Sequence, residues 1–356
     1  MATSVIQQLD SMSAFEARKA LEAVRDRLEA GCHRYFGATS TVELAQVSGH
    51  AYSSTGVLRV RSGQQTRTLI AKTVAGEADA ERGTVGQIER EHGALARCAE
   101  IFRGSDSVGA PAPVASFPDL HAIVMERVEG TSLSAVLTEA RFWPSNAKLR
   151  VLERLCRQCG EWVGRLQKAT AATARAGSLD LLASCRNELA YLAGHPIPPV
   201  TDEFIATVGS HVVRLGARLE GQPIAVAGTH GGLGPYNVIV SPDRRKVTVI
   251  DFAGFRTDSV YADYFKFRGR LEMLASSPAF SRRVVRRLVA AFTEGYARPV
   301  DDSAPLSRIL QIGFVLDRMT AYVEGARTGT LPLRQRLPRR LLFRRHYQWL
   351  SHACRT

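Results

Sequence analysis

The sequence predicts an α+β protein of two lobes, in which a small β-rich lobe precedes a larger and mostly helical one. Short segments with strand character are concentrated between residues 42 and 126, and one helical stretch lies among them. After Gly130, apolar residues recur every three or four positions over long stretches, interrupted by one compact β segment at 222–256. With 356 residues the chain can bury a substantial core. We therefore expect a ligand site in a cleft between two lobes.

The first lobe is expected to begin with an amphipathic helix over residues 14–36, which ends at Gly31 or Gly37. Three strands follow at residues 42–49, 55–62 and 67–74. The loop at 49–55 joins the first two, and Ser62-Gly63-Gln64-Gln65 forms a hairpin turn between the second and third. A helix through 88–102 and a strand pair that ends within 121–130 complete the lobe.

The second lobe is expected to contain helices at about 132–140, 146–175, 180–193 and 201–220, and to become helical again after the β segment. These patterns predict four parts of the chain. They are an N-terminal helical extension at 1–38, an N-lobe at 39–128, a C-lobe at 129–330 and a basic tail at 331–356.

Composition is that of an ordinary soluble globular protein, with 45% hydrophobic and 23% charged residues. No apolar run is long enough to cross a bilayer. The first twenty residues have no basic stretch followed by an apolar segment, so we do not expect a secretory signal. Cys156 and Cys159 form a CxxC, but a second CxxC or a nearby His pair is missing, so we interpret them as buried or half-buried helical thiols. The six scattered cysteines favour the reducing cytoplasm.

The net charge of +13 indicates anionic partners, and much of the excess lies in the tail. Basic and aromatic residues alternate there, which suits either an interfacial helix on an anionic membrane or a solvated helix that packs its apolar side on the core. We favour the second interpretation. The first would place the protein peripherally at the inner membrane face through residues 331–350. No specific nucleic-acid partner is expected.

The strongest local signal is the segment 229–255. Its hydrophobic runs NVIV and KVTVIDF predict two strands of a hairpin turned at Ser241-Pro242-Asp243. Asn237 begins the first strand and Asp251 ends the second, and His230 stands before the first. An amide oxygen and a carboxylate at the ends of paired strands form an oxygen site suited to Mg²⁺ that holds phosphates.

This segment resembles the catalytic and metal-binding loops of the aminoglycoside phosphotransferase and choline kinase-like family, which has a bilobal protein kinase-like fold. The family pattern H-G-D-x-x-x-x-N, followed by a hydrophobic strand and I-D-[FW], is matched from His230 to Asn237 and from Ile250 to Phe252. The resemblance covers roughly residues 40–330. It implies catalytic or metal roles for His230, Asn237 and Asp251, with His230 holding the loop, and Asn237 and Asp251 binding the metal.

Other segments fall where the resemblance requires them. Lys72 resembles the third-strand lysine that contacts the α- and β-phosphates, and Glu91 resembles its helical partner, with Glu89 as second choice. The nucleotide-covering loop is implied at 49–55, with Gly49, Ser53 and Ser54 as its binding residues. The hinge is implied at 125–128, where Met125, Glu126 and Val128 offer backbone groups to adenine. Asp258 and Asp263 are interpreted as structural residues.

The family pattern is broken at one position, because Gly232 replaces the aspartate that accepts the proton of the acceptor hydroxyl. General-base help contributes on the order of 10²–10⁴-fold, so its loss should impair turnover without abolishing nucleotide binding. The resemblance thus implies an impaired or atypical phosphotransferase that uses ATP or GTP with Mg²⁺ and acts on a small-molecule or glycan-type hydroxyl.

Four alternatives stay open at this point. The enzyme uses another base or an acceptor that is already ionised, or the chain is an inactive variant of an active enzyme. It is otherwise a pseudokinase that binds nucleotide in a regulatory or scaffolding role. The last alternative is a polyanion binder that uses the basic tail.

Overall fold

The structure is a computed structural model that describes residues 2–49, 53–74, 84–139, 141–142, 144–175, 180–331 and 333–354. The chain divides into two compact units. The first comprises Met1–Gly130 with Thr248–Phe255, and the second comprises Thr131–Val247 with Arg256–Thr356. The β-rich N-terminal unit and the mostly helical second unit confirm the fold class predicted from the sequence.

The first unit is built on an antiparallel sheet of five strands in the order β1-β2-β3-β6-β5. A two-stranded pairing places β4 beside β11. The elements of this unit are α1 (Ala2–Ala30), α2 (Cys32–Phe36), β1 (Thr41–Gly49), β2 (Ser53–Ser62), β3 (Gln65–Val74), α3 (Thr84–Ile101), β4 (Val108–Gly109), β5 (Pro113–Phe117), η1 (Pro118–Leu120), β6 (Ala122–Glu126), β11 (Val247–Val249) and η4 (Phe252–Gly254).

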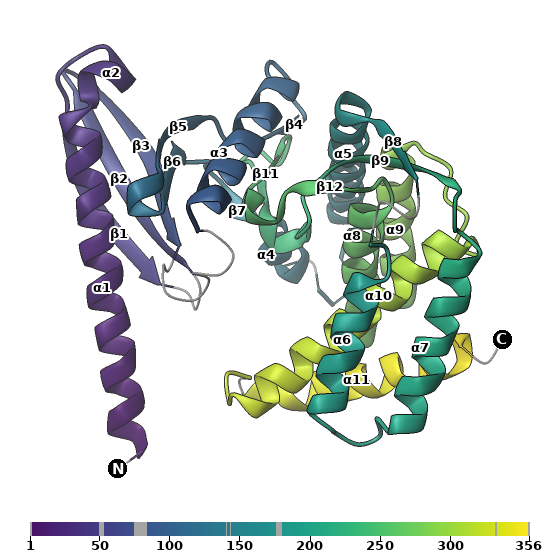
Figure 1. Ribbon diagram of the computed structural model, residues 1–356. Coiled ribbons are helices and arrows are strands. Elements are labelled where there is room, and N and C mark those ends of the chain that lie inside the picture. The colour runs from purple at the N-terminus through teal and green to yellow at the C-terminus, as the bar shows by residue number, and fades with distance from the viewer. Residues whose placement is uncertain are drawn as a thin grey trace. The chain divides into compact units, whose positions relative to one another are not determined.

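Helix α1 lies along one face of this sheet (Figure 1). Leu21, Val24 and Leu28 recur at helical spacing and are fully buried in a core shared with Leu58 and Val60 of β2. The helix stops at Gly31, and the short α2 ends at Gly37, whose φ of 71° suits glycine. The helical character predicted for residues 14–36 is confirmed, with an end at each of the two glycines named from the sequence, but α1 begins at Ala2 and thus earlier than predicted.

The second unit surrounds a small antiparallel sheet in the order β12-β9-β8 and a pairing of β10 with β7. Its elements are β7 (Thr131–Ser132), α4 (Leu133–Glu139), α5 (Asn146–Thr170), β8 (Ala172–Arg175), α6 (Ala183–Gly194), α7 (Asp202–Ala217), β9 (Pro223–Thr229), η3 (Pro235–Asn237), β10 (Val238–Val240), β12 (Arg256–Ser259), α8 (Ala262–Met273), η5 (Leu274–Ser276), α9 (Arg282–Tyr296), α10 (Pro305–Arg327) and α11 (Leu333–Ala353).

One predicted helix is too long. We expected a helix over 146–175, but α5 ends at Thr170 and residues 172–175 form β8. The side chain of Thr170 bonds the carbonyl of Leu166 and also accepts the N–H of Gly228 in β9. The chain leaves the helix there to pair with β9, a long-range ladder that local periodicity does not reveal.

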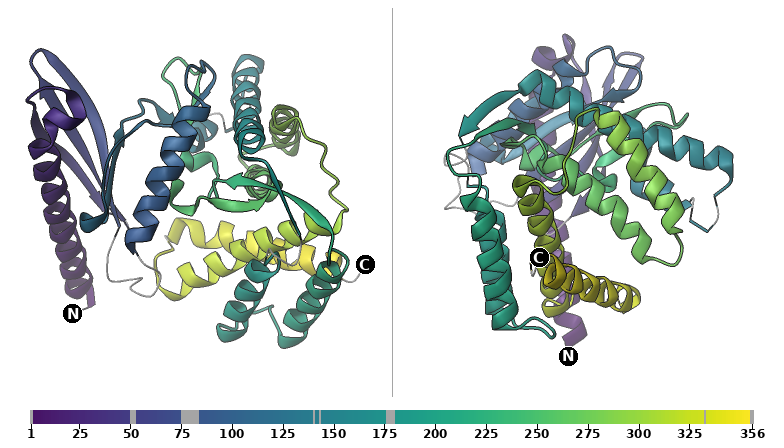
Figure 2. Two further views of the ribbon diagram at one scale, coloured as in Figure 1. Left: turned by 45° about the horizontal axis from the view of Figure 1, so that its top comes forward. Right: turned by 90° about the vertical axis from the view of Figure 1, so that its right-hand side faces the viewer.

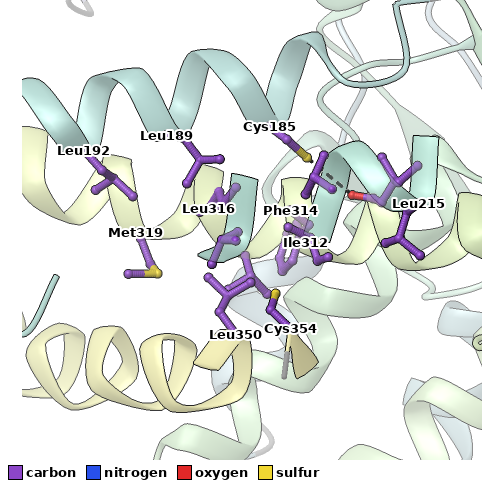
Figure 3. Packing of buried hydrophobic residues seen from close by; sticks show 14 of the residues in the cluster. Cys185, Leu189, Leu192, Leu215, Ile312, Phe314, Leu316, Met319, Leu350 and Cys354 are labelled. Carbon is purple, nitrogen blue, oxygen red and sulfur yellow. Dashed lines mark hydrogen bonds between the residues drawn. The ribbon is translucent and has the colours of Figure 1, made fainter. Parts of the chain in front are cut away.

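Helix α10 forms the centre of one hydrophobic core of the second unit, where it packs against α6, α7 and α11 (Figure 3). Ile312, Leu316 and Met319 of α10 are buried there. Figure 2 shows α11, drawn in yellow, lying beside α10. Phe343 and Leu350 of α11 enter the same core. The tail thus packs its apolar side on the core, as the favoured interpretation of its sequence expected.

Helices α5 and α9 approach each other at two glycines. A Cβ built on Gly160 would lie 2.1 Å from the carbonyl oxygen of Phe292, and one on Gly295 would lie 1.9 Å from that of Arg157. Only glycine permits so close a contact of two helices. The contact fixes α5, whose Gln158 side chain donates to the carbonyl oxygen of Arg245, beyond β10.

Candidate functional site

Lys72 lies in the middle of β3, opposite Thr55 of β2 and Ile123 of β6. Its Nζ donates to Oε1 of Glu91 at 2.8 Å and to Oδ1 of Asp251 at 2.6 Å. All three residues belong to the first unit, because that unit includes the segment Thr248–Phe255, which contains Asp251. Three residues that the sequence named from segments up to 179 positions apart are therefore in direct contact.

This cluster is a buried ion pair with one accessible side. Lys72 is 8% exposed and Glu91 is 1% exposed, whereas the side chain of Asp251 is 46% exposed. Burial works against the charged form of Lys72, but the carboxylates of Glu91 and Asp251 outweigh it and raise the pKa of the ammonium. Burial raises the pKa of Glu91, and the ammonium of Lys72 opposes that effect. The ammonium therefore stays charged beside an accessible carboxylate.

Asp251 follows β11 directly and adopts a left-handed conformation with φ 69° and ψ 74°. Aspartate is among the few residues that tolerate this region. The next residues form the short helix η4, so the chain turns sharply at the aspartate. Only Oδ1 is used by Lys72, and Oδ2 has no partner within the described ranges. The side chain thus keeps one free oxygen that could coordinate a cation.

Glu89, the second choice for the partner of Lys72, is exposed. It stands two positions before Glu91 on α3, which turns it to another side of the helix. The structure therefore selects the first choice, Glu91.

The predicted nucleotide-covering loop is described only at its two ends. Gly49 ends β1 and pairs with Ser54, while Ser53 begins β2 and pairs with Val74 of β3. His50–Tyr52, the tip of the loop, lie outside the described residues. The two ends confirm that a β1–β2 hairpin carries this loop.

The predicted hinge follows β6. Met125 pairs with Ile70 of β3, and the N–H of Glu126 donates to the carbonyl oxygen of Ala112 at 2.9 Å. The N–H of Glu126 is thus engaged within the protein. Val128 lies beyond the strand, and its backbone makes no hydrogen bond to a described residue. Of the backbone N–H groups of Glu126 and Val128, the structure leaves that of Val128 for a ligand.

In the second unit, the loop after β9 is held by a buried aspartate. The N–H of His230 donates to Oδ2 of Asp263 at 2.6 Å, and the N–H of Gly231 donates to Oδ1 at 3.0 Å. His230 and Asp263 are fully buried. The N–H of Gly232 donates to Nδ1 of His230 at 3.2 Å. Asp263 is thus a structural anchor, as expected, and His230 holds the loop.

Gly232 stands where the family pattern has its aspartate, and there is room for a side chain. A Cβ at this position would have Nδ2 of Asn237 and Nδ1 of His230 as nearest neighbours, each at 3.8 Å. Its φ is not in the left-handed region. Nδ2 of Asn237 donates to the carbonyl oxygen of Gly232 at 3.2 Å, which leaves the amide oxygen of Asn237 as an acceptor. The loop therefore keeps its form without the carboxylate.

Two cations that the sequence analysis did not single out reach this loop from α8. Lys266 Nζ donates to the carbonyl oxygen of Gly231, and Arg270 Nη1 donates to that of Gly232 at 3.2 Å. Arg270 also bonds the hydroxyl of Tyr236 and lies over its ring. Tyr236 is 51% exposed. The signal was present in the sequence, because Lys266 and Arg270 follow Asp263 at helical spacing.

A cavity of about 510 Å³ adjoins the loop within the second unit. The charged residues of its lining are Asp180, Glu188, Arg256, Asp258, Lys266, Arg270, Asp317 and Arg318. Gly231 is also part of the lining, so the cavity reaches the loop at the residue before Gly232. Its size and its place beside the loop make it a candidate acceptor pocket.

The CxxC of α5 carries no metal site. Cys156 and Cys159 are buried, and burial raises the pKa of the Cys156 thiol to about 12. Within the described ranges, no group of three or more His, Cys, Asp or Glu side chains is placed to hold a metal ion. The interpretation of these cysteines as buried helical thiols is confirmed. None of the described helices is both long and apolar enough to cross a membrane.

Comparisons with solved structures identify the fold. A choline/ethanolamine kinase family protein from Mesorhizobium loti is 14% identical and aligns over 95% of each chain with a TM-score of 0.51. A glucosamine kinase is 15% identical, over 87% of this chain and 94% of the other, with a TM-score of 0.51. An amicoumacin kinase in complex with AMP-PNP, Ca²⁺ and Ami is 12% identical, over 86% and 88%, with a TM-score of 0.52.

At the level of sequence, no curated protein matches the chain. Residues 52–301, however, match the phosphotransferase enzyme family, and this match spans more than half of the chain. It includes Lys72, Glu91 and Asp251 of the first unit and the loop from His230 to Asn237 in the second. The chain belongs to the phosphotransferase enzyme family, with a fold like that of the small-molecule kinases.

Proposed function

We propose that the protein binds ATP or GTP with Mg²⁺ and transfers the γ-phosphoryl group to a small-molecule or glycan-type acceptor. The observation that carries this proposal is the contact of Lys72 with both Glu91 and Asp251. A charged lysine fixed by a buried glutamate is a suitable partner for the α- and β-phosphates. A purely structural role explains this cluster less well, because removing the charged Lys72 and Glu91 side chains from water destabilises the folded protein.

Asp251 of the first unit and Asn237 of the second are, each within its own unit, candidate metal ligands by the resemblance of their segments to the family pattern. Each keeps an oxygen that serves no described protein donor, and carboxylate and amide oxygens are the ligands that Mg²⁺ takes. A bound Mg²⁺ neutralises charge on the phosphates. Within the protein, Lys72 would orient the nucleotide, Val128 would meet the adenine or guanine through its backbone, and His230 would keep the loop in shape.

The missing carboxylate at Gly232 makes the reaction atypical. Phosphoryl transfer passes through a loose transition state, so positioning and charge neutralisation supply most of the catalysis. The lost base removes on the order of 10²–10⁴-fold for a hydroxyl acceptor. A nucleotide-binding pseudokinase with a regulatory or scaffolding role is the second candidate, and Gly232 is the observation that favours it.

Thermal unfolding with nucleotide and Mg²⁺ tests the binding step, because any ligand of the native state raises the melting temperature. We expect ATP or GTP to raise it, and Asp251→Asn to remove most of the part that depends on Mg²⁺. Asp119→Asn is the matched control, since Asp119 is an exposed carboxylate of the same unit that pairs with Arg27. The absence of a shift with either nucleotide at millimolar concentration would contradict the proposal.

A further inference from the structure

Two cations of α8, Lys266 and Arg270, are directed at the loop that carries Gly232. They lie four residues apart on one face of the helix, and they donate to the carbonyl oxygens of Gly231 and Gly232 respectively. Both line the cavity beside the loop. The cations therefore face both the loop and the space in which an acceptor would bind.

Neither cation has an ionic partner among the residues that the structure describes. No carboxylate oxygen in those ranges lies within 4.0 Å of Lys266 Nζ or of the Arg270 guanidinium. Asp263, on the same helix, accepts the N–H groups of His230 and Gly231 instead. The positive charges of Lys266 and Arg270 are thus held by neutral carbonyl and hydroxyl groups.

The other two cations of the cavity are different. Arg256 pairs with Asp258 at 2.8 Å, and Arg318 pairs with Asp317 at 2.5 Å. Two of the four acidic side chains in the lining, Asp258 and Asp317, are therefore already in ion pairs.

The two remaining carboxylates are also engaged. Asp180 pairs with Arg186 at 2.5 Å, and Glu188 accepts the hydroxyl of Thr320. Burial raises the pKa of Glu188, which further weakens it as a counter-charge. The positive charge in excess therefore lies at the end of the cavity that meets the loop.

The positive charges of Lys266 and Arg270 destabilise the folded protein when no anion is bound beside them. Nε of Arg270 is buried and has no hydrogen-bond partner in the described structure. Burial lowers the pKa of the Lys266 ammonium, although the carboxylates of Asp263, Asp317 and Asp258 oppose it from a distance. Burial also lowers the pKa of the Arg270 guanidinium, and Tyr236 and Asp317 oppose that effect. A buried cation without a counter-ion is destabilising, and a bound anion would relieve that cost.

Gly232 leaves the loop without a negative charge beside the two cations. An aspartate at this position would place a negative charge on the loop whose carbonyls the two cations contact. The sequence has none there, and the nearest atoms to a Cβ are 3.8 Å away. The site therefore combines open space with two cations that form no ion pair with a described residue. An anionic group of the acceptor could occupy this space, at the position where an enzyme that phosphorylates a hydroxyl group has its basic aspartate.

We propose that the acceptor carries a carboxylate or phosphate group, and that Lys266 and Arg270 bind this anion beside Gly231 and Gly232. The inference rests on the proposed function and narrows its substrate class. An ionised oxygen needs no base, because it has no proton to lose. It would attack the γ-phosphorus of the nucleotide directly, and the bond from that phosphorus to the bridging oxygen would break as the nucleoside diphosphate leaves.

Anion binding to the whole protein tests this inference without knowledge of the natural acceptor. Inorganic phosphate and acetate serve as probes for the two sources, and chloride at equal ionic strength serves as the reference. We expect at least one probe to raise the melting temperature above that in chloride. Titration calorimetry then measures its affinity, and the probe that binds identifies the class.

Variants of the two cations localise the binding. Lys266→Met and Arg270→Gln should each weaken the affinity for the anion probe roughly tenfold or more, as expected for a lost charge-assisted hydrogen bond. Arg318→Gln is the matched control, because Arg318 lines the same cavity but pairs with Asp317. It should leave the affinity unchanged. If Arg270→Gln unfolds, Lys266→Met and Arg270→Lys still provide the test.

The outcomes separate this inference from the proposed function. Equal anion affinity in the Lys266→Met and Arg318→Gln variants, or no effect of either probe on the parent protein, would overturn the inference. Nucleotide binding with Mg²⁺ is measured on the same samples and depends on Lys72 and Asp251 instead. A nucleotide shift without an anion effect therefore refutes the anionic acceptor alone.

Discussion

The N–H of Gly232 donates to Nδ1 of His230 at 3.2 Å, so the loop that lacks the expected carboxylate is still fastened by the histidine of the same motif. The proton of the imidazole must then reside on Nε2 in the neutral form. Because Asp263 also holds the N–H of His230, the loop is set by groups other than the one it has lost. Its form therefore does not depend on an aspartate at position 232.

The substitution Gly232→Asp should create or restore phosphotransfer to a neutral acceptor. The backbone at this position is open to a side chain, and the nearest neighbours of a Cβ are at ordinary contact distance. With water as acceptor, hydrolysis of ATP should rise by roughly 10²-fold or more, because a base then accepts the proton of the nucleophile. The release of inorganic phosphate measures this rate.

The same variant distinguishes the two candidate functions. If both forms bind nucleotide and neither releases phosphate, the protein is a pseudokinase. If the parent protein turns over rapidly and Gly232→Asp slows it, another base or an ionised acceptor operates. Circular dichroism must first show that the variant is folded.

The substitution Glu91→Gln should weaken nucleotide binding roughly tenfold and lower the stability by about 1–3 kcal/mol. Glu91 is 1% exposed, and its loss leaves Lys72 with Asp251 as its one carboxylate among the described residues. The ammonium would then be free to move toward Asp251 and away from the phosphates. Titration with ATP and Mg²⁺ measures the loss of nucleotide binding, and chemical denaturation measures the loss of stability.

Glu89→Gln is the matched control for that substitution. Glu89 is exposed on the same helix, and an exposed substitution usually changes the free energy of unfolding by less than about 0.5 kcal/mol. Equal effects of the two substitutions would show that Lys72 does not rely on Glu91.

The arginines of α11 allow a test of membrane association that leaves the core intact. Because Phe343 and Leu350 are buried, deletion of the tail would expose the core, whereas Arg339, Arg340 and Arg344 are exposed. If the tail binds anionic membranes, replacing these three by glutamine should reduce sedimentation with anionic liposomes, at about 1 kcal/mol per charge. Added salt should have the same effect.

A control of equal charge is available on α9. Arg282, Arg283 and Arg286 are also exposed and can be replaced by glutamine in the same number. Equal losses from the two triple variants would indicate a general effect of the net charge. No binding by the parent protein would leave core packing as the role of α11.

His346 of α11 should make the stability depend on pH. Burial lowers its pKa from 6.5 to about 4, with a further contribution from Arg318. Between these values the unfolded chain binds more protons than the folded protein, so this residue makes the stability fall as the pH falls, by up to ~1.4 kcal/mol per pH unit. The effect is complete below the folded value.

Denaturation at a series of pH values between 4 and 7 measures this slope. His346→Gln should flatten it. His352→Gln, at an exposed position of the same helix, is the control. A slope that is unchanged by the first substitution would show that the pKa of His346 is the same in the folded and the unfolded protein.

Much of the fold was predictable because local patterns specify it. The alternation of the β1, β2 and β3 segments, the turn at Gly63 and the period of α1 each come from nearby residues. Strand β8 was not predictable, because Ala172–Arg175 joins a sheet through residues some fifty positions later. The contact of α5 with α9 was not predictable either, because a glycine within a helix does not indicate from the sequence which other helix packs against it.

The sequence by itself named the residues that we propose to carry the chemistry. The spacing of His230, Asn237 and Asp251, and the place of Lys72 on a strand, predicted a phosphotransferase site through their resemblance to the family pattern. The sequence also showed that Gly232 lacks a carboxylate. Between Glu89 and Glu91 it named a first choice, but only α3 as folded turns Glu91 toward Lys72 and Glu89 to solvent.

Only the tertiary structure decided the charge around the loop. Lys266 and Arg270 were two of 47 basic residues in the sequence, and no local pattern showed that their carboxylate neighbours are engaged elsewhere. Whether a charge is neutralised depends on groups brought within a few ångströms by the fold, because Coulomb energy falls with distance and rises with burial. Sequence specifies the charges, and packing specifies their partners.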